Sequence, residues 1–132
     1  MTLADRETSS AKRRILIVED EPFIALTLED MLFELGFVVA GCVADVPAAL
    51  ALIGREEIDG ALLDVNLGSQ SIDAVADLLA ERDCPFVFTT GYGRTGIPPA
   101  YANRAVLQKP FGMDDLATIL RNELGPAARS RA

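Results

Sequence analysis

The feature that most constrains this chain is the alternation of short apolar runs with segments whose apolar residues recur at helical spacing. Five runs are long enough to form strands, and they lie at residues 15–18, 37–39 with 42–43, 61–63, 86–88 and 105–107. Four of them are almost continuously apolar, as expected of strands that are buried on both faces of a parallel sheet. The pattern therefore predicts an α/β fold with a central parallel sheet.

The segments between the runs carry the signature of amphipathic helices. Apolar residues recur on one helical face over residues 24–35, 72–79 and 116–124, and a fourth helix is predicted over 46–53 with Asp45 as its N-cap. Strand–helix–strand alternation implies right-handed crossovers, and hence a doubly wound sheet of five parallel strands. The last crossover, residues 92–103, holds two glycines and two prolines without an apolar period. A helix at this place should therefore be short or mobile.

Length and terminal composition indicate a single domain. The chain has 132 residues, of which 50% are apolar, and this is enough for one core. The polar residues 1–12 predict a flexible leader, residues 13–124 the domain, and residues 125–132 a flexible tail after a Gly-Pro stop. Only seven residues follow Gly125, which are too few for an attached output module.

Charge and composition exclude several functions. The net charge of −8 makes the chain a poor binder of nucleic acid or of anionic membrane. Without histidine it cannot use Ser-His or Cys-His catalysis, nor an imidazole metal ligand. No signal peptide or membrane-length apolar run is present, and Cys42 and Cys84 form no CxxC pair. We therefore expect a cytoplasmic protein with two buried, reduced cysteines.

Polar residues follow four of the five predicted strands. Glu19 and Asp20 follow the first, Asp64 the third, Thr90 the fourth and Lys109 the fifth. Any one of them alone is equally well explained as a helix cap, a turn residue or a surface charge. Because ligands of open α/β sheets bind beyond the carboxyl ends of the strands, the conjunction predicts one acidic pocket with an ammonium group in it.

This residue set suits phosphoryl transfer. Hard oxygen ligands without His or Cys select Mg²⁺, which accepts one or two carboxylates together with phosphate oxygens. A carboxylate can also attack phosphorus to form an aspartyl phosphate, while Mg²⁺, a lysine and a hydroxyl neutralise the transferred group.

Four motifs in this order resemble the receiver domain of two-component response regulators. They are VEDEP after ILI, LLDVN, TTG after FVF, and QKPF, and the resemblance covers residues 13–124. It implies a flavodoxin-like sheet with strand order 2-1-3-4-5 and a chain that is not a turnover enzyme but accepts, and then itself hydrolyses, a phosphoryl group.

The resemblance also implies a role for each matching residue. Asp64 would accept the phosphoryl group, Thr90 would turn its hydroxyl towards it, and Lys109 would pair with it, with a cis peptide bond before Pro110. The Mg²⁺ site would be formed by Asp20, Asp64, Glu19 through a bound water, and the backbone carbonyl of Asn66.

The sequence departs from most receivers at the switch position. An aromatic residue is usual three positions before the lysine, where this chain has Val106. Together with FTTGYG and the proline-rich crossover, this resembles the single-domain FATGUY receivers of alphaproteobacteria, although Thr89 replaces the alanine of that motif. Tyr92 and Tyr101 are the candidates for the switch; alternatively, both rings simply pack the loop.

The expected function is that of a single-domain response regulator. A sensor histidine kinase, with the HWE or HisKA2 type as candidate, would phosphorylate Asp64 in a Mg²⁺-dependent reaction within a stress response. The signal would leave through contact with a downstream protein, through a phosphotransferase in a phosphorelay, or by draining phosphoryl groups. The alternatives are a partner-docking module that works without phosphorylation and a small phosphohydrolase, which the Asn66 position and the absence of room for a cap disfavour.

Overall fold

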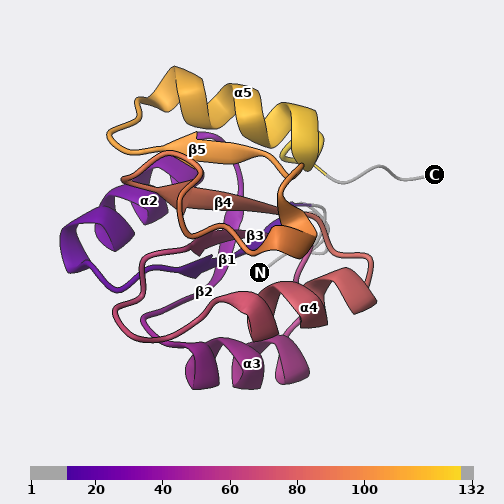
Figure 1. The fold of residues 1–132 in the computed structure, drawn as a ribbon. Helices are drawn as coiled ribbons and strands as arrows, with labels where there is room; N and C mark the ends of the chain where they lie inside the picture. The colour runs from indigo at the N-terminus through magenta and orange to yellow at the C-terminus, as the bar shows by residue number, and fades with distance from the viewer. Residues whose placement is uncertain (1–11, 129–132) are drawn as a thin grey trace.

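The computed structural model describes residues 12–128 and places a five-stranded, all-parallel sheet at the centre of the molecule (Figure 1). The strand order is β2-β1-β3-β4-β5, which confirms the expected 2-1-3-4-5 order. The strands are β1 (Arg14–Val18), β2 (Val38–Val43), β3 (Gly60–Asp64), β4 (Phe86–Thr90) and β5 (Val106–Gln108).

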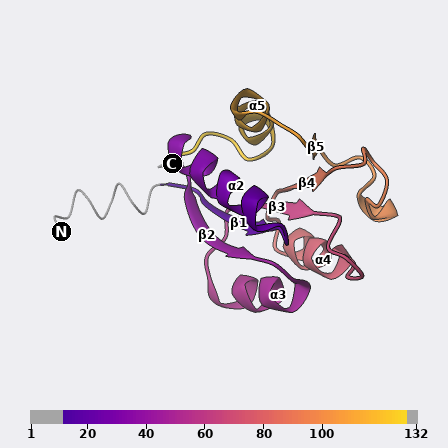
Figure 2. The same ribbon diagram turned by 90° about the vertical axis from the view of Figure 1, so that its left-hand side faces the viewer.

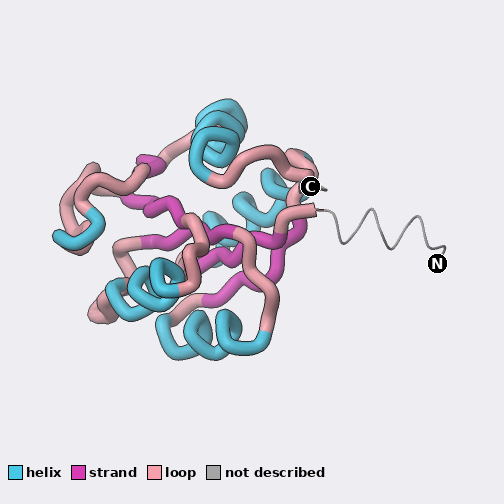
Figure 3. The backbone as a smooth tube through the Cα atoms, turned by 90° about the vertical axis from the view of Figure 1, so that its right-hand side faces the viewer, coloured by secondary structure: helices cyan, strands magenta, loops and turns pink. Residues whose placement is uncertain are grey.

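Four α-helices cover the two faces of the sheet. They are α2 (Pro22–Glu34), α3 (Val46–Arg55), α4 (Asp73–Glu81) and α5 (Met113–Glu123). Helices α3 and α4 lie on one face, and α2 and α5 lie on the other, so the sheet is wound on both sides (Figures 1 and 2). Figure 3 shows the same layers from the opposite side, with the strands enclosed between helices.

The burial pattern explains why the strand segments are continuously apolar. In β1, Leu16 and Val18 face the core beneath α3 and α4, whereas Ile15 and Ile17 face the core beneath α2 and α5. All four side chains are at most 1% exposed. A strand of this kind needs apolar residues at both its odd and its even positions, because neither face of the sheet is exposed to water.

Helix ends follow the local signals of the sequence. The side chain of Asp45 accepts a hydrogen bond from the Ala48 amide at 2.9 Å, which confirms it as the N-cap of α3. Because β2 is an edge strand, this aspartate serves its helix only. After α2, Gly36 adopts a φ of 91°, a conformation that costs glycine little.

The crossover from β4 to β5 contains only one turn of 3-10 helix, η1 (Pro99–Tyr101). This agrees with the expected shortness of a helix at this position. Turns link the remaining residues, with Gly93 and Gly96 at φ values of 64° and 93°.

The two chain ends of the domain differ in part from the expected leader and tail. The Arg13 amide donates a hydrogen bond to the Ala127 carbonyl at 2.8 Å, and Lys12 and Ala128 form an antiparallel bridge. Residues 125–128 are therefore held against the start of β1, and Ala127 packs on the core beneath α5. The rest of the expected leader and tail, residues 1–11 and 129–132, lies outside the described residues. Over 12–128, no helix has the length and apolarity needed to cross a membrane.

Candidate functional site

The predicted site residues meet at the carboxyl edge of the sheet. Asp64 and Thr90 are the last residues of β3 and β4, Glu19 and Asp20 directly follow β1, and Lys109 directly follows β5. The register pairs Asp64 with Thr89, so the ends of β3 and β4 are level with each other. The parallel sheet thus brings together residues that are up to 90 positions apart in the chain.

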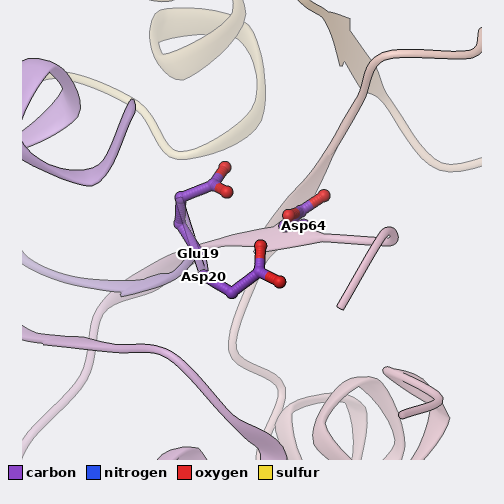
Figure 4. A group of neighbouring side chains, drawn as sticks. All are labelled: Glu19, Asp20 and Asp64. Atoms are coloured by element: carbon purple, nitrogen blue, oxygen red, sulfur yellow. The ribbon is translucent and has the colours of Figure 1, made fainter. Parts of the chain in front are cut away.

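Three carboxylates form an acidic cluster at this edge (Figure 4). One oxygen from each of Glu19, Asp20 and Asp64 lies within 4.8 Å of the others. Glu19 and Asp64 are buried, at 2% and 1% exposure, whereas Asp20 is exposed. The cluster therefore has a dry side and an open side, through which solvent or a ligand can enter.

Lys109 supplies the positive charge of the cluster. Its Nζ lies 2.8 Å from Oε1 of Glu19 and 3.5 Å from Oδ1 of Asp64. The backbone fixes this position, because the Lys109 amide donates a hydrogen bond to the Thr90 carbonyl at 2.8 Å. The Lys109–Pro110 peptide bond is cis, as the resemblance to receiver domains implies.

Burial and ion pairing shift the pKa values of Glu19 and Lys109 in opposite directions. Burial raises the pKa of Glu19 to about 7, although the Lys109 ammonium and the Glu21 amide act to lower it. For Lys109, burial acts to lower the pKa, but the neighbouring Glu19 and Asp64 carboxylates hold it above its ordinary value. The lysine is therefore charged at neutral pH, and Glu19 is the group that titrates there.

Thr90 and Asn66 complete the floor of the site. The Asn66 amide donates a hydrogen bond to Oδ1 of Asp64 at 2.9 Å, and the Asn66 side-chain Oδ1 lies 3.5 Å from Oγ1 of Thr90. The buried Thr90 hydroxyl also accepts a hydrogen bond from the Tyr92 amide at 3.0 Å. The hydroxyl is thus tied to the first residues of the crossover.

The donor set fits a hard divalent cation. The three clustered side chains offer only oxygen atoms, which is the preference of Mg²⁺. Oε1 of Glu19 is buried, and the Lys109 ammonium, 2.8 Å away, is the cation beside it. A buried carboxylate oxygen in that state is stabilised by additional positive charge nearby.

The two tyrosines of the crossover have different environments. The Tyr92 side chain is 72% exposed. The ring of Tyr101 packs against Phe86 and Phe88, at centroid distances of 5.5 and 6.3 Å, and its hydroxyl donates a hydrogen bond to Asp77 of α4 at 2.5 Å. The contact with Asp77 is absent from the sequence-based expectations, because no sequence pattern joins the two positions.

The outer face of α2 is a second feature that sequence reasoning missed. Phe23, Leu26 and Phe33 are 84%, 55% and 79% exposed, and we call these three residues the α2 stripe. The helical periodicity contained the signal, because all three are apolar residues that fall outside the core-facing positions. A groove of about 450 Å³ lies beside the stripe and reaches Lys109.

The fold and the site together define a receiver domain, a signalling module rather than a turnover enzyme. The family model for the response regulator receiver domain matches residues 15–121, and the chain belongs to that family. The Phyllosphere-induced regulator PhyR of Methylorubrum extorquens is 34% identical over 116 residues, which cover 83% of this chain and 43% of PhyR. The chain thus spans less than half of this relative.

Solved receiver structures agree with this assignment. SdrG from Sphingomonas melonis Fr1 is 49% identical, with a TM-score of 0.76 and coverage of 83% of this chain and 94% of SdrG. A BeF3-activated conformation of SdrG also matches, at 48% identity, a TM-score of 0.73 and coverage of 84% and 95%. The receiver domain of the Pseudomonas aeruginosa sensor histidine kinase PA1611, solved with magnesium in its active-site cleft, is 30% identical, with a TM-score of 0.75 and coverage of 87% and 99%.

Proposed function

We propose that this chain is a response regulator whose Asp64 accepts a phosphoryl group from a histidine kinase. The observation that carries the proposal is the position of the Asp64 carboxylate. It is buried at the carboxyl edge of the sheet, 3.5 Å from the Lys109 ammonium, and it belongs to an acidic cluster that opens to solvent at Asp20. A carboxylate held in this way is a nucleophile with a cation beside it to receive the negative charge of the incoming group.

The transfer replaces one bond to phosphorus with another. An oxygen of Asp64 forms a bond to phosphorus while the bond between phosphorus and the imidazole nitrogen of the donor breaks, and that nitrogen then takes up a proton. Lys109 gives up its partial pairing with Asp64 and contacts the new phosphoryl oxygens, and the Thr90 hydroxyl donates to another of them. In the later hydrolysis, the oxygen of a water molecule forms a bond to phosphorus while the bond between phosphorus and the Asp64 oxygen breaks, which releases inorganic phosphate and a proton and restores the Asp64 carboxylate.

Glu19, Asp20, Asp64 and the Asn66 backbone carbonyl would hold Mg²⁺, with Glu19 acting through a water. The ion supplies charge neutralisation for the phosphoryl oxygens. The support for this assignment is the all-oxygen cluster, whose three carboxylates share a single ammonium group, that of Lys109, in the described part of the chain.

The α2 stripe and its groove provide the surface on which the phosphodonor docks. The groove is lined by Ile24, Pro110 and Phe111 and ends at Lys109, so a helix lying along it would bring its side chains to the site. A helix that is apolar on its outer face as well as its inner one normally has a partner. The exposed acidic residues Glu21, Asp30 and Glu34 on and beside α2 suit a donor helix with basic flanks.

The wider role that we propose follows the relatives. A sensor kinase of the HWE or HisKA2 type would phosphorylate the chain in a stress response, since the similar protein PhyR is a stress response regulator. Signal would then pass to a downstream protein or a phosphotransferase. A cytoplasmic location agrees with the two free cysteines, Cys42 and Cys84.

Incubation with acetyl phosphate and Mg²⁺ followed by intact-mass measurement tests the central proposal. We expect one phosphoryl mass on the wild-type chain and none on Asp64→Asn. An added phosphoryl mass on the Asp64→Asn variant, or its absence from the wild type, would refute the assignment.

For the docking surface, Phe23→Ala should slow transfer from a phosphorylated kinase but leave the acetyl phosphate reaction unchanged. Equal slowing with both donors would argue against docking on α2.

A further inference from the structure

The two halves of the crossover between β4 and β5 are held by different contacts, and the Arg94 guanidinium joins them by donating a hydrogen bond to the Ala102 carbonyl at 2.8 Å. In the first half, the hydrogen bonds from Thr95 to Tyr92 and from Ile97 to Arg94 are both 3.4 Å long. The second half is held by packing and by a hydrogen bond from Tyr101 to Asp77.

The anchor at Tyr101 is built from several contacts. Its ring packs on Phe86 and Phe88 of β4, and the Arg104 guanidinium lies over the rings of Phe86 and Tyr101, at 4.4 and 5.6 Å from their centroids. Its hydroxyl reaches Asp77, an exposed residue in the middle of α4. The hydrogen bond to Asp77 raises the pKa of Tyr101, so the phenol keeps its proton and donates at neutral pH.

The Tyr101–Asp77 hydrogen bond joins the two segments that begin at the site. Helix α4 follows the loop whose Asn66 amide donates to Oδ1 of Asp64 at 2.9 Å. The crossover follows Thr90, whose hydroxyl accepts the Tyr92 amide at 3.0 Å. A phosphoryl group on Asp64 engages both the carboxylate oxygens and the Thr90 hydroxyl, so it disturbs the first hydrogen bond of each segment.

We propose that the Tyr101–Asp77 hydrogen bond is a latch that holds the crossover on α4 in the unmodified chain and opens when Asp64 is loaded. A hydrogen bond this short requires its two segments to keep one relative position, and it weakens steeply when they shift. Both partners lie at the surface, so water replaces the lost bond when the latch opens. This inference rests on the function proposed for Asp64.

Linkage fixes the sign of the effect. If loading opens the latch, the latch opposes loading, and a variant without it binds a phosphoryl mimic more tightly. The net value of one surface hydrogen bond corresponds to roughly a two- to tenfold gain in affinity. A hydrogen bond with only a structural role predicts unchanged or weaker binding.

Beryllofluoride with Mg²⁺, a mimic of the phosphoryl group, provides the test. The chain has no tryptophan and two tyrosines, so its fluorescence reports the crossover alone. In the Tyr92→Phe variant the signal comes from Tyr101, whose emission is quenched while its hydroxyl donates to a carboxylate. We expect this emission to rise on loading, and Tyr101→Phe and Asp77→Ala to bind beryllofluoride roughly two- to tenfold more tightly than wild type.

The double variant should bind no more tightly than either single variant, because both remove the same bond. Unchanged Tyr101 emission in chains that melt at a higher temperature with beryllofluoride would overturn the latch and leave the proposed function standing. The same holds for unchanged or weaker binding by both single variants. Beryllofluoride that shifts the melting temperature of neither wild type nor Asp64→Asn would overturn the proposed function, and the latch with it.

Discussion

Replacing Lys109 with methionine should destabilise the metal-free chain by an amount that grows with pH. The substitution keeps the length of the side chain but removes the ammonium group that lies 2.8 Å from Glu19. The Glu19 side chain is fully buried, and its pKa is already raised to about 7 with the lysine in place. Without Lys109 that pKa rises further, because the lysine acts to lower it.

Protonation of Glu19 limits the destabilisation that Lys109→Met causes, so this destabilisation depends on pH. The folded-state pKa lies above the ordinary value of 4.5, so Glu19 contributes its full stability below pH 4.5 and loses it as pH rises through about 7. Below pH 6 both proteins carry a neutral Glu19, so the variant loses there only what the contact between Lys109 and the buried Asp64 contributes. Above pH 7 only the wild type ionises, and the gap grows by about 1.4 kcal/mol per pH unit.

We therefore expect an additional, pH-dependent loss of about 1 kcal/mol at pH 8 and about 3 kcal/mol at pH 9; the second value reaches the lower end of the 3–5 kcal/mol typical of an unpaired buried charge. Urea unfolding in EDTA between pH 5.5 and 9 measures this difference in the free energy of unfolding between the wild type and the variant. The matched control is Lys12→Met, the other lysine of the chain, which should leave the pH profile unchanged. A loss for Lys109→Met that is equal at pH 6 and pH 9 would refute the reasoning and leave packing and the contact with Asp64 as the roles of the lysine.

Three further predictions concern the metal site and the scaffold. Millimolar Mg²⁺ should raise the melting temperature of the wild type, and Asp20→Asn should remove most of that rise while changing the metal-free stability little, since Asp20 is exposed. Gly60→Ala should cost about 1–3 kcal/mol in urea unfolding, because its β-carbon would lie 2.7 Å from Cγ of the buried Leu124, whereas Gly54→Ala, with open space in α3, should stabilise by up to about 1 kcal/mol. Asp45→Ala should cost about 1 kcal/mol through loss of the α3 cap, and a variant that unfolds like wild type would contradict that role.

The parallel sheet and the position of the site could be anticipated because they depend on local patterns, whereas the strand order came from the motif resemblance. A continuously apolar run such as 15–18 needs burial on both faces, and a polar residue directly after it can lie only at the carboxyl edge of a parallel sheet. The convergence of Asp64, Thr90 and Lys109 follows from those two facts. Motif resemblance added the assignment of roles, and the cis Lys109–Pro110 bond agrees with it.

The position of the tail after Gly125 could not be predicted from local sequence patterns. Its composition indicated a loose end, but Ala127 and Ala128 pair with Arg13 and Lys12, directly before β1. That pairing depends on where α5 delivers the chain, which no window of sequence contains. The α2 stripe is similar, because periodicity identifies the inward face of a helix but not whether the outward face stays uncovered.

The sequence by itself determined the class of fold, the residue types of the acidic site and the lack of a long helix in the last crossover. Each of these depends on the spacing and the type of residues along the chain. Only the tertiary structure decided which polar side chains are buried and which of them form hydrogen bonds with distant residues. Glu19 and Asp64 are buried while Asp20 is open, and Tyr101 meets Asp77 across 24 positions of chain. Burial and long-range hydrogen bonds depend on how α4 and the crossover pack together on the sheet, and these contacts set the electrostatics of the site.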